Sequence, residues 1–177
     1  MLRGSRIGLR ARHEADVPVL QAELYDDVVT RSRADSRPWR PIAPGSAASP
    51  YAVADPGDEA ACFSVVSLEE DDKLAGEALL WGIDTHNRSA HLGISLRPMF
   101  RRRGLAVDVL RVLCDYGFAV RGLHRLQLET LADNTAMIRA ASRAGFTQEG
   151  KLRSSAWANG GFVDEVVFGL LADAWRA

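Results

Sequence analysis

The 177-residue sequence has little cysteine, almost no net charge and no long apolar run. Its two cysteines, Cys62 and Cys114, form no CxxC pair, so we expect two buried or half-buried free thiols in a reducing compartment. The four histidines show no spacing typical of a zinc site. A formal net charge of -1 gives no global field that would attract nucleic acid or an anionic membrane.

Apolar stretches such as Ala78–Trp81 are far too short to cross a bilayer. The first residues contain no apolar segment of the kind that a signal peptide needs, so a cytoplasmic protein is expected. Hydrophobic residues make up 47% and charged residues 25%, which excludes disordered and collagen-like classes. The length fits one domain with its own core, spanning residues 1–177.

The order of the predicted elements indicates an α+β fold. Hydrophobic periodicity predicts helices at 13–24, 104–120 and 136–143, and strands at 7–11, 61–66, 74–83, 90–96, 126–131, 146–158 and 162–170. The strands between 61 and 96 indicate an antiparallel meander, and Asn159-Gly160-Gly161 predicts a hairpin. Residues 35–58 contain five prolines and are predicted to be a loop, either pinned by its aromatic rings or acting as a lid.

The most informative segment runs from Leu96 to Ala106, where a strand ends, three arginines follow and a helix begins at Gly104. The free N–H groups of a first helical turn and the helix dipole favour an anion. Glycine lets a diphosphate approach the backbone, and arginines add charge-assisted contacts. The Walker and dinucleotide-binding glycine patterns are absent. The alternative is a solvated arginine cluster that caps a core helix.

The segment Arg101–Ala106 resembles the diphosphate loop, Gln/Arg-x-x-Gly-x-Gly/Ala, of the GNAT acetyltransferases. Ala90–Leu96 is similar to the strand that enters this loop, and Leu131–Asn134 followed by Ala144–Phe146 resembles the family's Asn-to-Gly-Phe segment. Leu152–Asp164 resembles the C-terminal hairpin of the Rim-type branch, the ribosomal-protein N-terminal acetyltransferases. The similar segments appear in the family's order.

The resemblance implies one GNAT-type domain, with a mainly antiparallel, twisted mixed sheet that splays between its fourth and fifth strands and is flanked by helices. It implies acetyl-CoA as co-substrate and no metal. The diphosphate would bind the first-turn amides, Asn134 the pantetheine chain and Arg143 the nucleotide end, with a plain helix cap and a surface arginine as alternatives. The implied cofactor-binding residues are Ser95, Leu96, Arg97, Arg101, Arg102, Arg103, Gly104, Leu105, Ala106, Asn134 and Arg143.

The implied activity is an acyl-CoA-dependent N-acetyltransferase, in which a primary amine attacks the thioester directly. His91 occupies the place of a family glutamate and is the candidate general base, with a chemically silent strand histidine as the alternative. Glu77 and Asp84 are fallback bases on the preceding strand. Trp39 and Trp157 are expected to wall the acceptor site, with packing as the alternative.

The general acid is missing from its usual places. The family's tyrosine and serine positions fall on Ala141 and Met137, and Ser142 lies near them without support from the family pattern. A non-catalytic acyl-CoA-binding module is therefore the main alternative, and a nucleotide- or nucleic-acid-binding protein is the weakest. The expected partner is a protein N-terminus or a small-molecule amine, not nucleic acid or a membrane. Dimers are frequent in the family, so the resemblance allows a homodimer.

Overall fold

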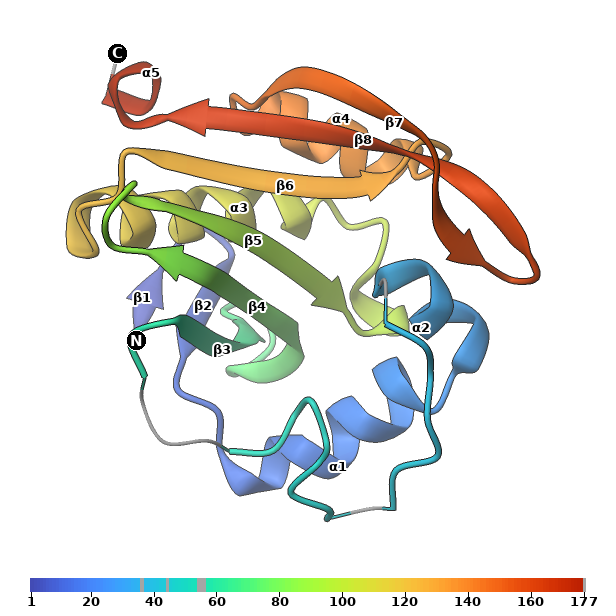
Figure 1. Cartoon of the computed structure of the whole chain (residues 1–177). Coiled ribbons are helices and arrows are strands. Elements are labelled where there is room, and N and C mark those ends of the chain that lie inside the picture. The colour runs from blue at the N-terminus through green and yellow to red at the C-terminus, as the bar shows by residue number, and fades with distance from the viewer. Residues whose placement is uncertain (36, 44, 54–56, 177) are drawn as a thin grey trace.

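The computed structural model describes residues 1–35, 37–43, 45–53 and 57–176. Its centre is an eight-stranded sheet in the order β1-β2-β3-β4-β5-β6-β8-β7 (Figure 1). Only the β5–β6 contact is parallel, so the predicted α+β fold with a mixed, mainly antiparallel sheet is confirmed. The strands are β1 Leu2–Arg3, β2 Ile7–Arg10, β3 Ala60–Ser67, β4 Lys73–Asp84, β5 Ser89–Leu96, β6 Arg125–Leu131, β7 Thr147–Ala158 and β8 Gly161–Leu171.

The sheet opens between β5 and β6, which are the fourth and fifth of the predicted strands because β1 was not predicted. The expected splay is therefore present. The β5–β6 pairing has three rungs and ends at His91 opposite Gln127. Beyond this point β5 follows β4 as far as Leu96, whereas β6 follows β8 as far as Leu131. Because each strand keeps its own antiparallel neighbour, the twist of the two halves separates them and leaves one edge of β5 without a partner strand in the described chain.

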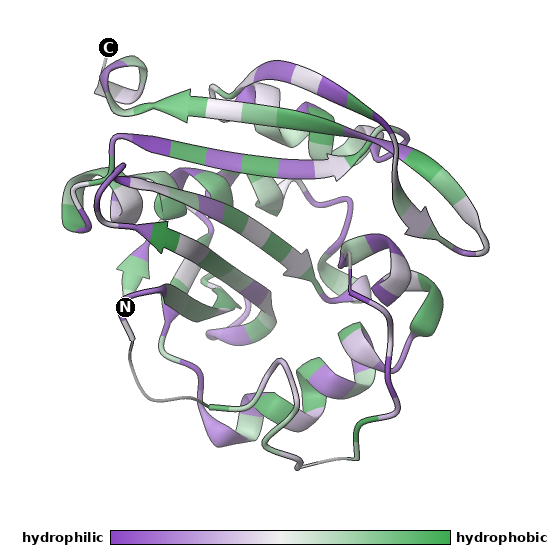
Figure 2. Cartoon of the chain, viewed as in Figure 1, coloured by the Kyte–Doolittle hydropathy of each residue, from purple (hydrophilic) through white to green (hydrophobic). Residues whose placement is uncertain are grey.

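The helix α3, Leu105–Asp115, packs its apolar face on the sheet (Figure 1). Leu105, Val109, Leu110 and Leu113 are fully or almost fully buried, as their helical spacing predicts. The apolar positions alternate with polar ones along β6 (Figure 2), so one strand face completes this core. The helical path continues as a π turn, Tyr116–Val120, and α4, Thr135–Arg143, follows β6.

The N-terminal helical region differs from its prediction. The expected helix at 13–24 is a 3₁₀ turn at Glu14–Asp16, α1 at Val17–Leu20 and a π turn at Gln21–Tyr25. A further helix, α2 at Val28–Ala34, was not predicted, because its polar sequence lacks an apolar period. The short elements β1 and α5, Ala172–Arg176, were also missed, since two to five residues carry too little periodicity.

The proline-rich segment at 35–58 contains no helix or strand among its described residues, which confirms the predicted loop. It is held down by aromatic side chains: Tyr51 is fully buried, and the Trp39 indole donates to the Tyr25 carbonyl over 3.1 Å. The cysteine prediction is half right, since Cys114 is buried but Cys62 is exposed. Cys62 lies on β3, where alternate residues face away from the α3 core.

Candidate active site

The opening turn of α3 has the geometry of an anion-binding site. Gly104 caps the helix with a left-handed φ of 77°, a conformation that favours glycine. Within the described chain, the amides of Gly104, Leu105 and Ala106 donate no hydrogen bond to another protein group. A Cβ at Gly104 would have one neighbour within 4 Å in the described chain, the Arg6 Nη1 atom at 3.8 Å, so the space before the turn is open. Arg101 and Arg102 are exposed beside it.

Two further arginines of the loop, Arg97 and Arg103, form ion pairs within the protein. Arg97 forms an ion pair with Glu23, with nitrogen–oxygen distances of 2.5 and 3.0 Å. Arg103 pairs with Glu70 at 2.5 Å. These ion pairs fix the loop to its neighbours, and a contact of either guanidinium group with a diphosphate stays a prediction. Sequence reasoning could not separate the four arginines, because their partners lie 74 and 33 residues away.

The splay places the ends of two strands next to this turn. Ser95 and Leu96 end β5 beyond its last pairing with β6, and the Leu96 carbonyl accepts from Arg101 Nε over 2.9 Å. Asn134 begins α4 just after β6: its Oδ1 accepts from the Met137 amide over 3.2 Å, and its Nδ2 donates to Thr130 over 3.0 Å. The helix-cap role is therefore present, and the pantetheine contact stays a prediction. Arg143 is exposed at the other end of α4.

His91 lies at the narrow end of the splay, on the sheet face opposite α3. Its ring stacks on Trp81, with centroids 4.3 Å apart, and its Nδ1 lies 3.2 Å from the Glu129 carboxylate. An Nδ1–H that donates to a carboxylate leaves Nε2 as a free acceptor, which is the arrangement of a base held in one tautomer. Glu129 was not predicted, although it follows Gln127 on the polar face of β6.

Glu77, the first fallback base, is buried opposite Ser95 and bound by Arg12, with 2.9 Å between Oε2 and Nη2. Burial raises the pKa of the Glu77 carboxyl against the opposing effect of Arg12. The other fallback, Asp84, caps its own turn by accepting from the His86 and Asn87 amides. Arg12 thus occupies one oxygen of Glu77, and the turn amides occupy Asp84, so the role of either carboxylate as a base stays a prediction.

The positions expected for a general acid are unsuitable. Ala141 is fully buried in the core, and Met137 packs against that core. The Ser142 hydroxyl is exposed and donates to the Ile138 carbonyl within the helix over 3.0 Å. Ala141 and Met137 therefore cannot donate a proton, and the Ser142 hydroxyl is committed to a carbonyl of its own helix.

Trp39 and Trp157 are brought together, as their predicted shared role requires. Both line a groove of about 430 Å³ between α2, the proline-rich loop and the tip of the β7–β8 hairpin. Trp39 is pinned to Tyr25, whereas Trp157 is 61% exposed and makes an edge contact with Phe162. Loop packing and groove formation are thus compatible for Trp39. Their contact with an acceptor remains a prediction.

The described residues were also compared with the requirements of a metal site and of a membrane-spanning helix. Among the described ranges, no group of three or more His, Cys, Asp and Glu side chains is arranged to hold a metal ion. In the same part of the chain, no helix is both long enough and apolar enough to cross a membrane.

Comparison of the chain with known proteins identifies its family. The model of the acetyltransferase (GNAT) domain matches residues 6–147. An uncharacterized N-acetyltransferase, p20, of Bacillus licheniformis is 31% identical over 109 residues, which are 62% of this chain and 61% of that protein. The spermidine N(1)-acetyltransferase of Escherichia coli K12 is 32% identical over 99 residues, or 56% of this chain and 53% of that protein. The chain thus spans less than two thirds of either relative.

A solved structure, the spermidine N-acetyltransferase of Vibrio cholerae in complex with CoA and spermine, superposes with a TM-score of 0.81 over 98% of this chain and 99% of that one. The two are 21% identical, so this likeness concerns the fold. With the family match across residues 6–147, the splayed sheet and the open first turn of α3, the chain belongs to the GNAT acetyltransferase family.

Proposed function

We propose that this protein transfers an acetyl group from acetyl-CoA to a primary amine, which attacks the thioester directly. The observation that carries the proposal is the splay between β5 and β6, which opens beside the unbonded amides of Gly104–Ala106. An extended chain that ends in a diphosphate matches both features, because strand edges bind extended groups and helix N-termini bind anions.

The residues that would hold the co-substrate can be narrowed. The amides of Gly104–Ala106, with Arg101 and Arg102, would bind the diphosphate. The free edge of β5 at Ser95–Leu96 would bind the pantetheine arm. Arg97 and Arg103 act indirectly, by fixing the loop through their ion pairs. When bound, acetyl-CoA supplies the activated acetyl thioester.

His91 would remove the proton from the acceptor amine, with Glu129 holding its ring in the reactive tautomer. Trp81 limits rotation of the ring by stacking on it. A strand amide of β5 would stabilise charge that develops on the carbonyl oxygen. A thiol has a pKa of about 8.5, so the departing sulfur can take its proton from solvent and needs no acid at Ala141 or Met137.

A non-catalytic acyl-CoA-binding module is the second candidate, because Ala141 and Met137 cannot donate a proton. Calorimetry with CoA and a free-thiol assay over a panel of amines separate the two functions. Binding together with thiol release supports the transferase. Binding without release from any amine supports the module, and the absence of CoA binding contradicts both.

Three finer features belong to the same proposal. The Rim-type hairpin motif supports a protein N-terminus as acceptor, whereas the similarity to spermidine acetyltransferases supports a small-molecule amine. Free cysteines fit a cytoplasmic location, where thiols stay reduced. A homodimer, which the family resemblance allows, is tested by light scattering of the purified protein.

A further inference from the structure

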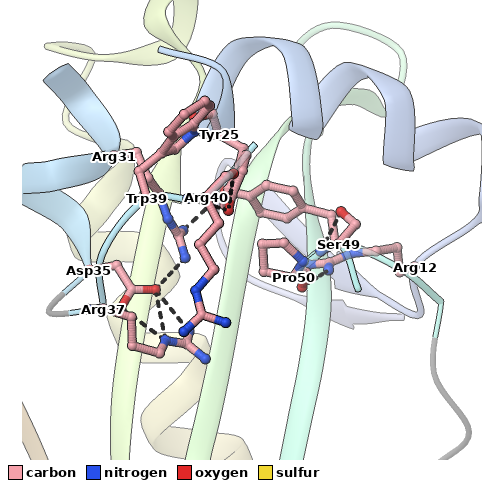
Figure 3. Close-up of polar contacts among 10 residues, drawn as sticks. Arg12, Tyr25, Arg31, Asp35, Arg37, Trp39, Arg40, Ser49 and Pro50 are labelled. Atoms are coloured by element: carbon pink, nitrogen blue, oxygen red, sulfur yellow. Dashed lines mark hydrogen bonds and ion pairs between the residues drawn. The ribbon is translucent and has the colours of Figure 1, made fainter. Parts of the chain in front are cut away.

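The groove beside Trp39 and Trp157 has one arginine, Arg37, in its lining, and the charges around this arginine carry information about the acceptor. Arg37 lines the groove together with Asp35, and its side chain is 77% exposed. Figure 3 shows Arg31 and Arg37 converging on Asp35. The groove therefore contains fixed charges whose balance can be examined.

Asp35 is the carboxylate that lines the groove, and it is already neutralised. Arg31 binds one of its oxygens, and Arg37 donates through Nε and Nη2 over 2.8 to 3.3 Å. Burial opposes ionisation, but the hydrogen bonds from Arg37 outweigh it and lower the pKa of Asp35. This group stays ionised and is committed to two guanidinium groups, so it offers little to a cationic ligand.

Charged side chains continue from the groove to the face of the sheet that carries His91. Arg31 lies 3.4 Å from the Tyr51 hydroxyl, and Arg12 stacks over the Tyr51 ring at 5.5 Å. Arg12 in turn binds Glu77, which faces Ser95 at the splay. Arg12 also keeps one buried donor, Nε, that finds no acceptor in the described chain. The cluster thus connects the groove to the unpaired part of β5.

Positive charge is in excess along this path. Arg12, Arg31 and Arg37 are joined by Arg40, whose exposed side chain extends toward Arg37 and Asp35 (Figure 3). Four guanidinium groups therefore face two carboxylates, Asp35 and Glu77. Within the described residues, Arg40 forms no ion pair with a carboxylate, and Arg37 has Nη1 left over. Unspent guanidinium donors beside aromatic walls are suited to a carboxylate or a phosphate.

We infer that the acceptor is a primary amine whose body carries a carboxylate or phosphate group, held by Arg37 and Arg40. The inference rests on the proposed acetyltransferase function and specifies its substrate class. The Vibrio cholerae acetyltransferase of similar fold was solved in complex with spermine, a polycation. A polycation would meet excess positive charge beside and beneath the groove of the present protein and would find both carboxylates already paired.

The test compares matched acceptors in the thiol-release assay. Two short peptides share a free alanine N-terminus and differ in carrying glutamates or lysines, while phosphoethanolamine and spermidine complete the set. We expect kcat/KM for an anionic acceptor to exceed that for its cationic counterpart at least about tenfold, the scale of one charge-assisted hydrogen bond. The glutamate peptide and phosphoethanolamine show which anion the groove prefers.

Charge reversal at Arg37 supplies the second measurement. Arg37→Glu should lower kcat/KM for the anionic acceptor about ten- to hundredfold and raise it for the lysine peptide, with CoA affinity unchanged. Arg3→Glu, an equal charge change on exposed β1 at the opposite edge of the sheet, should leave the ratio of the two acceptors unaltered. Arg40→Gln gives a milder variant that leaves the Arg31–Asp35–Arg37 contacts in place.

The outcomes are distinguishable. If spermidine or the lysine peptide reacts as well as the anionic amines, or if Arg37→Glu leaves their ratio unchanged, the inference is wrong and the acetyltransferase proposal survives. If no amine releases thiol although CoA binds, the proposed function fails as well. Preference for the anionic amines that is lost in Arg37→Glu and kept in Arg3→Glu supports both.

Discussion

Replacing Arg12 by methionine tests whether the ion pair beneath the candidate site is as isolated from water as the structure indicates. Arg12 and Glu77 have side chains that are 5% and 11% exposed, and Glu77 has no other hydrogen-bond donor in the described chain. Methionine keeps much of the side-chain volume but leaves a buried carboxylate without its counter-ion. Removing one partner of a buried pair typically costs about 3–5 kcal/mol, a large share of a domain's stability.

The loss should depend on pH in a defined direction. Burial already raises the pKa of Glu77, and removing Arg12 removes the main effect that lowers it. The folded carboxyl then binds its proton more tightly than the unfolded one, so stability falls as pH rises between the two pKa values. The Arg12→Met deficit should therefore be largest at pH 7 to 8 and should shrink as pH approaches 5.

Urea unfolding followed by tryptophan fluorescence at pH 5, 7 and 8 measures this deficit. Adding Glu77→Gln to Arg12→Met should recover most of the lost stability, because the unpaired charge is then gone. Arg3→Met, at an exposed position on β1, is the control and should change stability by less than about 0.5 kcal/mol. A deficit below about 1 kcal/mol at pH 7, or one that does not change with pH, would refute the reasoning.

Three further predictions address the co-substrate, the base and acid stability. Gly104→Glu should abolish CoA binding in calorimetry, because its carboxylate would stand where the diphosphate binds and its φ of 77° would strain any side chain; retained affinity contradicts the loop assignment. His91→Ala should lower kcat with little change in acetyl-CoA affinity. Glu129→Gln should alter the pH profile of kcat, measured at saturating acceptor, and leave KM unchanged. Unchanged rates in both variants would contradict the assignment of His91 and Glu129 to the base. Although burial opposes it, hydrogen bonding from Arg10 lowers the pKa of Asp16 to about 2. The stabilisation from Asp16 is thus complete above the unfolded pKa of about 4 and is lost as pH falls toward 2. Thermal denaturation should show Asp16→Asn losing about 2 kcal/mol at pH 7 and progressively less below pH 4, so a constant loss would contradict the assignment.

The sequence alone predicts those features of this protein that depend on a short segment of chain. The apolar spacing after Gly104 specifies a buried helix, and the glycine marks its start because few other residues adopt its backbone conformation. Asn159-Gly160 marks the hairpin for a similar reason, since both residues have positive φ. The anion site follows directly, because it consists of the backbone of one short segment.

The α2 helix shows where this reasoning stops. Its residues form no apolar stripe at helical spacing. Asp27 is recognised as its cap from the structure, in which the Thr30 amide donates to the Asp27 carboxylate. Packing of the neighbouring segments rather than local propensity determines this helix. The same holds for the irregular helical path at 14–25, which no periodicity could divide into three parts.

Residue order was enough to specify the strands β2 to β8, the main helix and the place where an anion can bind, because those depend on neighbours within a few residues. Long-range packing, in contrast, commits Arg97 and Arg103 to ion pairs and brings His91 to Glu129. It also brings the two groove tryptophans together. These partners come from distant elements, and a strand shifted by one residue would turn each side chain to the opposite face of the sheet.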